Sequence, residues 1–275
     1  MRKYFDLYFA RSFVRSFFDD DIMTTSAALS YYMVFSFFPL LIMISIFLGR
    51  LNIDPAMENI INNILPDDVI DVAEKYLEFV NSEGSGNILF ASAFFTVYFP
   101  VRAVMKLMNG IRRAYNRKHK ISFIKRSISL VMYAMAVYIM IVFGIFIISM
   151  GDTAVSLLLK MLSLPIYFSD LWRWLKFIIL WCISICIILA LHYSSSQGKI
   201  KLRYMLPGCV ISVTVWTVVS ALFSFYVKYM GRYSVLYGSI GAVIILLYWF
   251  YITSVILLMG AEFSGCLVQR IEELG

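Results

Sequence analysis

The sequence has 275 residues, of which 61% are hydrophobic and 15% are charged, and its formal net charge is +7. Soluble domains have about 25% charged and about 45–50% apolar residues, so this composition excludes an ordinary soluble enzyme or binding domain and indicates an integral membrane protein. The four cysteines form neither a CxxC motif nor a metal-ligand spacing. We therefore expect free thiols, no metal and no cofactor.

Residues 1–21 alternate bulky apolar side chains with basic ones. The basic residues are Arg2, Lys3, Arg11 and Arg15. Aromatic residues recur every three or four positions, which predicts an amphipathic helix lying in the membrane interface with its basic edge toward lipid headgroups. Three acids, Asp19 to Asp21, then interrupt the pattern. We expect Thr24, Thr25 or Ser26 to cap the first membrane span.

Six apolar runs are each long enough to cross the hydrocarbon core of a bilayer, which takes roughly 20 residues of helix. These runs are residues 26–49, 87–108, 127–150, 174–193, 205–230 and 239–263. The last two are joined by a short turn and should form an antiparallel hairpin. The fold class we predict is all-α, a polytopic membrane protein in which residues 1–275 make one domain.

The extracytoplasmic loop that we expect at residues 50–86 is the longest outer segment and carries eight of the seventeen acids. Within it, Pro66, Asp67 and Asp68 are typical of a helix start, because proline needs no N–H partner there and acids favour the helix dipole. The sequence therefore predicts a short helical cap on the outer side of the spans.

The placement of Lys and Arg predicts the orientation of the chain. With a cytoplasmic N-terminus, the inner segments hold fifteen of these residues and the outer segments hold seven. Positive charge is enriched in cytoplasmic loops. We therefore expect a multi-pass protein of the bacterial inner membrane with both termini in the cytoplasm.

The second span carries a polar stripe formed by Arg102, Lys106, Asn109 and Arg113, which follow one another at helical spacing. Arg102 lies about 10 Å from the inner end of the span, at 1.5 Å per residue. Charges at this depth are costly unless they reach the interface, a partner or water. Two interpretations stay open: the side chains stretch to the inner headgroups, or they form a path for an anionic substrate or lipid headgroup.

Glu262, near the end of the sixth span, is the acid we expect to pair with Lys106 or Arg102, and a role in ion coupling is a further hypothesis. Pro39 and Pro100 fall inside the first and second spans, where each leaves a carbonyl without its helical partner. Either they are static kinks, or the two spans line a cavity. Polar residues on one face of the first span support the cavity: Thr25, Tyr32 and Ser36.

Three sequence blocks resemble one known family. The first contains Ala27 to Tyr32 with Phe35, Ser36 and Pro39 to Leu41, and the second is Asn109 to Asn116. The third contains Pro207-Gly208, Tyr237-Gly238-Ser239 and Gly260-Ala261-Glu262. In this order they are similar to the motifs of the YihY/BrkB family of bacterial inner-membrane proteins, which was once mislabelled as ribonuclease BN. The resemblance implies the fold and leaves the activity open, since a virulence or transport role has also been attached to the family.

We expect the protein to move an amphiphilic or anionic substrate, such as a lipid, across or between leaflets. The alternative is a non-transporting scaffold for envelope integrity that anchors lipid or a partner protein. We expect no enzyme and no nucleic-acid partner, because the basic loop at residues 112–126 contains no acid for RNA cleavage. Anionic lipid headgroups at the cytoplasmic face are the partners that this basic loop favours, and self-association as a homo-oligomer stays open.

Overall fold

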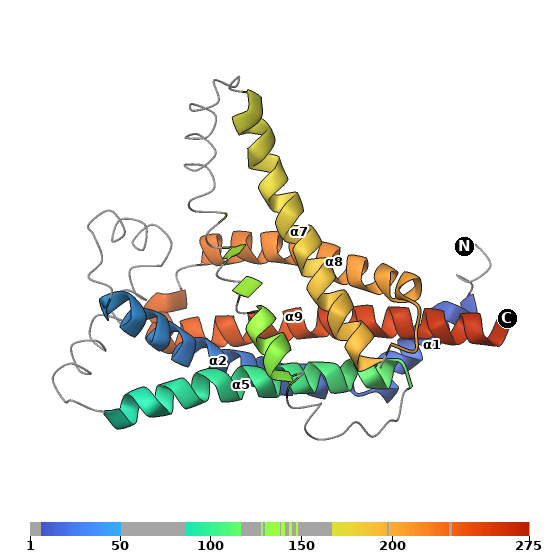
Figure 1. The fold of residues 1–275 in the computed structure, drawn as a ribbon, viewed down its shortest axis with the longest axis horizontal. Coiled ribbons are helices and arrows are strands. Elements are labelled where there is room, and N and C mark those ends of the chain that lie inside the picture. The colour runs from blue at the N-terminus through green and yellow to red at the C-terminus, as the bar shows by residue number, and fades with distance from the viewer. Residues whose placement is uncertain are drawn as a thin grey trace. The chain divides into compact units, whose positions relative to one another are not determined.

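The computed structural model describes residues 7–50, 86–116, 128, 130–137, 139–140, 143–144, 147, 167–196, 198–230 and 233–274. The regular secondary structure of these residues is α-helical, as predicted. The longer helices are α1 (Leu7–Asp19), α2 (Ile22–Arg50), α5 (Gly86–Ala114), α7 (Tyr167–Ser195), α8 (Leu202–Met230) and α9 (Tyr233–Leu274) (Figure 1). Described residues between 128 and 147 are also helical. The helical cap expected between α2 and α5 lies outside the described residues.

Three helical segments of the described chain are long and apolar enough to cross a membrane: Trp174–Ser195, Leu202–Val227 and Val243–Glu273. They contain most of the predicted fourth, fifth and sixth spans. Large apolar side chains stay exposed along α8, among them Val218, Leu222 and Phe225, as lipid contact requires. The predicted first and second spans lie within α2 and α5, and the total of six spans stays a prediction.

The chain divides into two compact units. The first comprises Met1–Val34, Val101–Val137 and Trp181–Gly275, and the second comprises Phe35–Pro100 and Tyr138–Leu180. Most of the described core lies in the first unit, where α2, α5, α8 and α9 contribute buried apolar side chains. Leu29, Ile111, Met205 and Leu258 are examples from these four helices.

The junction between α1 and α2 differs from the expected one. Helix α2 begins at Ile22 rather than at Ser26, and Asp21 precedes its first turn. The N–H of Thr25 donates to the carbonyl of Asp21 at 3.1 Å, so Asp21 occupies the N-cap position in place of Thr24, Thr25 or Ser26. Asp21 has φ 51°, a left-handed conformation that Asp adopts more readily than most residues, and this sharp turn separates the two helices.

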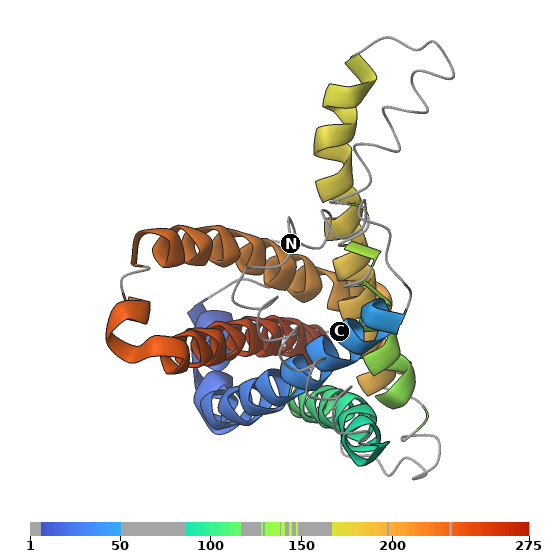
Figure 2. The ribbon, with the colours of Figure 1, turned by 90° about the vertical axis from the view of Figure 1, so that its left-hand side faces the viewer.

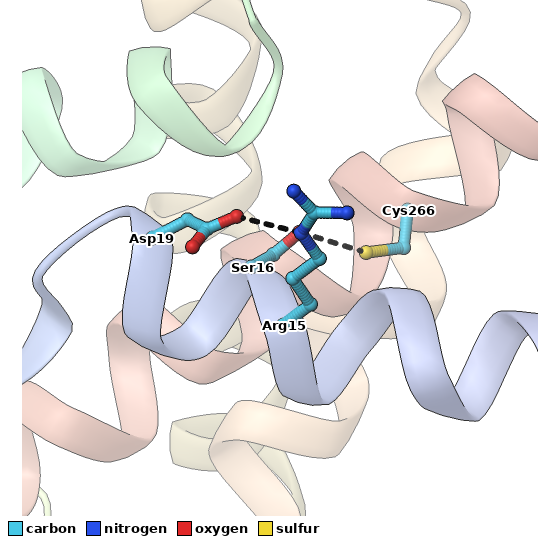
Figure 3. Close-up of polar contacts among 4 residues, drawn as sticks. All are labelled: Arg15, Ser16, Asp19 and Cys266. Atoms are coloured by element: carbon cyan, nitrogen blue, oxygen red, sulfur yellow. Dashed lines mark hydrogen bonds and ion pairs between the residues drawn. The ribbon is translucent and has the colours of Figure 1, made fainter.

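Helix α1 packs against the C-terminal part of α9 (Figures 1 and 2). The ring of Phe263 lies edge-on to Phe9, at 5.3 Å between centroids, and to Phe13, at 6.2 Å. On the same face, the Ser16 hydroxyl lies 3.8 Å from the thiol of Cys266 (Figure 3). The aromatic face of the predicted interfacial helix therefore has a protein partner.

Helices α8 and α9 form the antiparallel hairpin that the sequence predicts, and small residues hold them in close contact. The N–H of Gly208 donates to Ser264 Oγ at 3.1 Å, and Ser212 Oγ donates to the carbonyl of Ile256 at 3.3 Å. A methyl group added to Gly260 would lie 2.6 Å from the carbonyl oxygen of Gly208. Small residues let membrane helices approach this closely, which explains why the Pro207-Gly208 and Gly260-Ala261-Glu262 motifs need glycine.

Gly260→Ala should therefore lower the thermal midpoint of the purified protein in detergent, with a loss of about 1–3 kcal/mol from overpacking. Gly144→Ala is the matched control. The nearest atom to a methyl group there, Leu180 Cδ2, lies at an ordinary 3.6 Å, so Gly144→Ala should be neutral or slightly stabilising. Equal midpoints for the two variants would show that α8 and α9 are not in such close contact.

Candidate functional site

Parts of the three sequence blocks meet in the first unit, although they are far apart in the sequence. Helix α5 brings the second block against α9: a methyl group on Gly110 would overlap the side chain of Leu258, and one on Gly265 would lie 2.7 Å from the carbonyl carbon of Ala114. Helix α2 brings the first block against α5, since the guanidinium of Arg102 lies over the ring of Tyr32. The Arg113 guanidinium donates to Thr25 Oγ1, just before the block. These contacts assemble a polar site inside an otherwise apolar core.

The centre of this site is Glu262, whose side chain is 3% exposed. The carboxyl of Asp20, at the turn between α1 and α2, lies within hydrogen-bonding reach of Glu262, and the charge of Arg113 acts on it. We call Asp20, Thr25, Arg113 and Glu262 the Glu262 site. Glu262 is buried, Asp20 is partly buried and Arg113 is exposed, so the positive charge of Arg113 offsets negative charge at the buried end of the site.

The register of α5 against α9 explains why Arg113 is the base near Glu262. Gly110 lies opposite Leu258, and Ala114 lies opposite Gly265. Glu262 falls between these two contacts, so it faces the α5 turn that contains Arg113. Lys106 and Arg102, the partners expected from the sequence, lie about two and three turns away from Arg113 along α5. Helix α9 also continues to Leu274, well beyond the expected end of the span.

The polar stripe of α5 and the polar face of α2 face each other in the structure. At one end Arg113 donates to Thr25, and at the other the guanidinium of Arg102 lies over the ring of Tyr32, 5.7 Å from its centroid. Nε of Arg102 is buried. Lys106 and Asn109, which lie between the two arginines in sequence, are partly buried within the described chain. The structure thus brings together residues that the sequence placed on separate helices.

A second buried group, which we call the Tyr115 relay, consists of His192, Tyr115 and Ser264. Tyr115 Oη lies 2.8 Å from His192 Nδ1, and Ser264 lies within hydrogen-bonding reach of the Tyr115 hydroxyl. Ser264 Oγ donates to the carbonyl of Met205 at 2.9 Å. Tyr115 and His192 share one buried hydrogen bond, whose direction is set by the tautomer of His192. The relay therefore connects α7, the end of α5, α9 and α8.

Burial raises the pKa of Tyr115 well above that of an exposed tyrosine, and the charge of Glu262 acts in the same direction. The Tyr115 hydroxyl consequently keeps its proton and can donate a hydrogen bond as well as accept one. Tyr115 is 3% exposed and His192 is 1% exposed, so water cannot replace a lost partner at either end.

The other residues singled out in the sequence are divided between the two units. Pro39 and Pro100 lie inside the continuous helices α2 and α5, and they fall in the second unit together with Ser36. Thr25 and Tyr32 fall in the first unit, so the cavity expected between the two spans stays a prediction. Within the described residues, no group of three or more His, Cys, Asp and Glu side chains could hold a metal ion. The four cysteines are free thiols, as predicted.

Four residues of the Glu262 site and the Tyr115 relay were missed from the sequence, His192 among them, and two of the four had a signal. Tyr115 belongs to the second block, and Ser264 follows the third block by two positions, so both could have been suspected from the resemblance. Asp20 had none, because only the fold of α1 back onto α9 brings it to Glu262.

Comparison with known proteins gives the family. A family model described as virulence factor BrkB matches residues 13–274. The chain belongs to the BrkB family. The resemblance seen in the three sequence blocks is thereby confirmed.

Relatives of this BrkB-family chain carry two kinds of name. A protein of Bacillus subtilis (strain 168) named as ribonuclease-like, YfkH, is 24% identical over 246 residues, which cover 89% of this chain and 90% of the relative. A UPF0761 membrane protein of Vibrio vulnificus (strain YJ016) is 24% identical over 269 residues, which cover 95% of this chain and 83% of the relative.

A UPF0761 membrane protein of Xanthomonas campestris pv. campestris (strain B100) is 25% identical over 274 residues, which cover 94% of this chain and 60% of the relative. This BrkB-family chain therefore spans about three-fifths of that relative's length. No solved structure matches the chain. The apolar helices and the relatives named as membrane proteins together make this a membrane protein.

The Glu262 site predicts energetic coupling between Arg113 and Glu262. Arg113→Gln leaves two carboxyls without their nearby base, so its loss of stability should shrink when Glu262→Gln is also present. We expect a coupling of about 0.5–3 kcal/mol in thermal midpoints of purified protein. Lys106→Gln is the control and should be additive with Glu262→Gln. Coupling of Glu262 to Lys106 rather than to Arg113 would contradict this register of α5 against α9.

Proposed function

We propose that this BrkB-family membrane protein moves an amphiphilic or anionic substrate, such as a lipid, across or between leaflets of the bacterial inner membrane. The observation that carries the proposal is the direction of Arg102. Its guanidinium lies over Tyr32 of the neighbouring helix and its Nε is buried, instead of the side chain stretching along α5 toward an interface. A charge turned inward at this depth is expensive and marks a substrate pathway more often than an anchor.

The polar stripe supplies the chemistry that such a substrate needs. The guanidinium groups of Arg102 and Arg113 present planar sets of donors that match phosphate or carboxylate, and Lys106 adds a compact positive charge. The amide of Asn109 both donates and accepts. An anionic group moving along α5 would exchange one set of donors for the next. At the end of the stripe it would compete with Glu262 and Asp20 for Arg113.

The sequence bears on the energy source and on the orientation. The chain contains no nucleotide-binding motif, so transport would be passive, ion-coupled or driven by a partner protein. Glu262 is the residue we propose for ion coupling, because it is a buried acid at the end of the stripe. The fifteen-to-seven bias of Lys and Arg supports a cytoplasmic location of both termini.

The second candidate is the scaffold for envelope integrity, and one observation favours it. Helices α5 and α9 touch without room for a side chain at Gly110 and Gly265. Helices packed this closely resist separation, which suits a rigid anchor for lipid or a partner protein better than a moving gate. The ribonuclease-like name belongs to the Bacillus relative, and we do not propose that activity for this chain.

Arg102→Lys should lower substrate movement while leaving the thermal midpoint nearly unchanged, and Arg102→Gln should lower it further. The expected loss for Arg102→Gln is about tenfold to a hundredfold, because a hydrogen bond to a charged group contributes about 1.5–3 kcal/mol. The assay follows a labelled anionic lipid between leaflets of liposomes that contain the purified protein, with a zwitterionic lipid for comparison.

Arg203 provides the matched control, since its guanidinium also lies over a tyrosine ring, 4.5 Å from the centroid of Tyr204, but at an exposed position outside the stripe. Arg203→Gln should leave lipid movement unchanged. If wild-type protein moves neither lipid faster than empty liposomes do, lipid transport is wrong. If the wild-type protein moves the anionic lipid and Arg102→Gln moves it equally fast, the polar stripe is an anchor.

A further inference from the structure

Helix α1 has two different faces. One face is covered by α9, through the contacts of Phe9 and Phe13 with Phe263. The opposite face is open and apolar at its centre, where Val14 is 56% exposed and Phe18 is 66% exposed. Arg11 and Arg15 flank these two residues, and the side chain of Arg15 is 81% exposed.

Water is a poor environment for this open face. An exposed valine and phenylalanine one helical turn apart leave apolar area in contact with solvent, which is unfavourable in proportion to that area. A surface helix with aromatic and aliphatic residues flanked by arginines is typical of a helix that lies at the boundary between lipid headgroups and acyl chains. The arginine stems can cover apolar surface while their guanidinium groups stay at headgroup level.

The chain itself indicates which partner covers this face. Helix α1 connects through Asp20 and Asp21 directly to α2, which contains the predicted first span. The next large apolar residues left exposed are Met23 and Tyr31 on α2. The exposed apolar surface of α1 thus continues in the sequence into a helix predicted to face lipid. Asp19 balances part of the positive charge through its 3.0 Å ion pair with Arg15 (Figure 3). Arg11 adds a further positive charge.

We propose that the open face of α1, formed by Arg11, Val14, Arg15 and Phe18, binds the surface of an anionic bilayer while the opposite face stays docked on α9. The bilayer surface offers acyl chains that Val14 and Phe18 can contact and phosphate groups that the arginines can bind. This proposal does not depend on transport, because a scaffold would present the same face to lipid.

The test uses the full chain with the native cysteines replaced and one new cysteine introduced. The test variants are Val14→Cys and Phe18→Cys, and Glu273→Cys is a water-exposed control near the C-terminus. Each carries a bimane label in phosphatidylglycerol–phosphatidylcholine liposomes. Labels at 14 and 18 should be quenched several-fold more by lipids brominated near the headgroup than the label at 273. The label at 273 should be quenched more by aqueous iodide. If replacing the buried Cys209 and Cys266 prevents folding, only the exposed Cys182 and Cys186 are replaced.

The charge part of the proposal has its own test. Arg11→Gln with Arg15→Gln should reduce lipid quenching at position 18 in phosphatidylglycerol-containing liposomes, with a much smaller effect in pure phosphatidylcholine. Equal effects in both lipids would overturn the preference for anionic lipid. Strong iodide quenching at 14 and 18 would show a solvated face, and protection from both quenchers would show that a second copy or another protein covers it. Either result overturns the proposal.

Discussion

The buried contact between Tyr115 and His192 is the constraint on which the described core depends most. It lies where α5 ends and α7 passes, and through Ser264 it reaches α9 and the first turns of α8. Apolar packing alone would allow these helices to slide, because lipid and protein interiors are similarly apolar. A chain of buried hydrogen bonds prevents such sliding, since any shift leaves a buried donor or acceptor without a partner.

This fixed arrangement explains where the charges lie. With Ser264 held between Tyr115 and Met205, and with Gly260 in contact with Gly208, α9 can present Glu262 only toward the end of α5. The base that meets it there is Arg113, while Arg102 turns toward Tyr32 of α2. The polar residues of the three family motifs therefore serve one structure, in which small residues set distances and polar residues set the register.

Much of this could be read from the sequence, and the rest could not for physical reasons. Apolar length and helical spacing predict membrane helices, the α8–α9 hairpin and the α5 stripe, because these are properties of contiguous residues. Tyr115 and His192 are 77 positions apart, and nothing in either local sequence points to the other. Pairing Glu262 with Lys106 assumed that equal depth in the membrane means contact, whereas the glycine contacts between α5 and α9 set a different register. The start of α2 was misplaced because Asp21 takes a left-handed conformation that spacing does not reveal.

The central claim is that the Tyr115 relay ties the four helices together, and a double-mutant cycle on thermal midpoints tests it most directly. Tyr115→Phe should cost about 1–3 kcal/mol because it leaves the buried Nδ1 of His192 without its hydrogen-bond partner. His192→Leu should cost much less in the Tyr115→Phe background than it does in the wild-type protein. Tyr133→Phe is the matched control, since that hydroxyl donates to the carbonyl of Ala190 at an exposed site, at 3.0 Å, and its loss should be nearly silent. Additive effects of the two relay substitutions, with Tyr115→Phe no more harmful than Tyr133→Phe, would contradict the account.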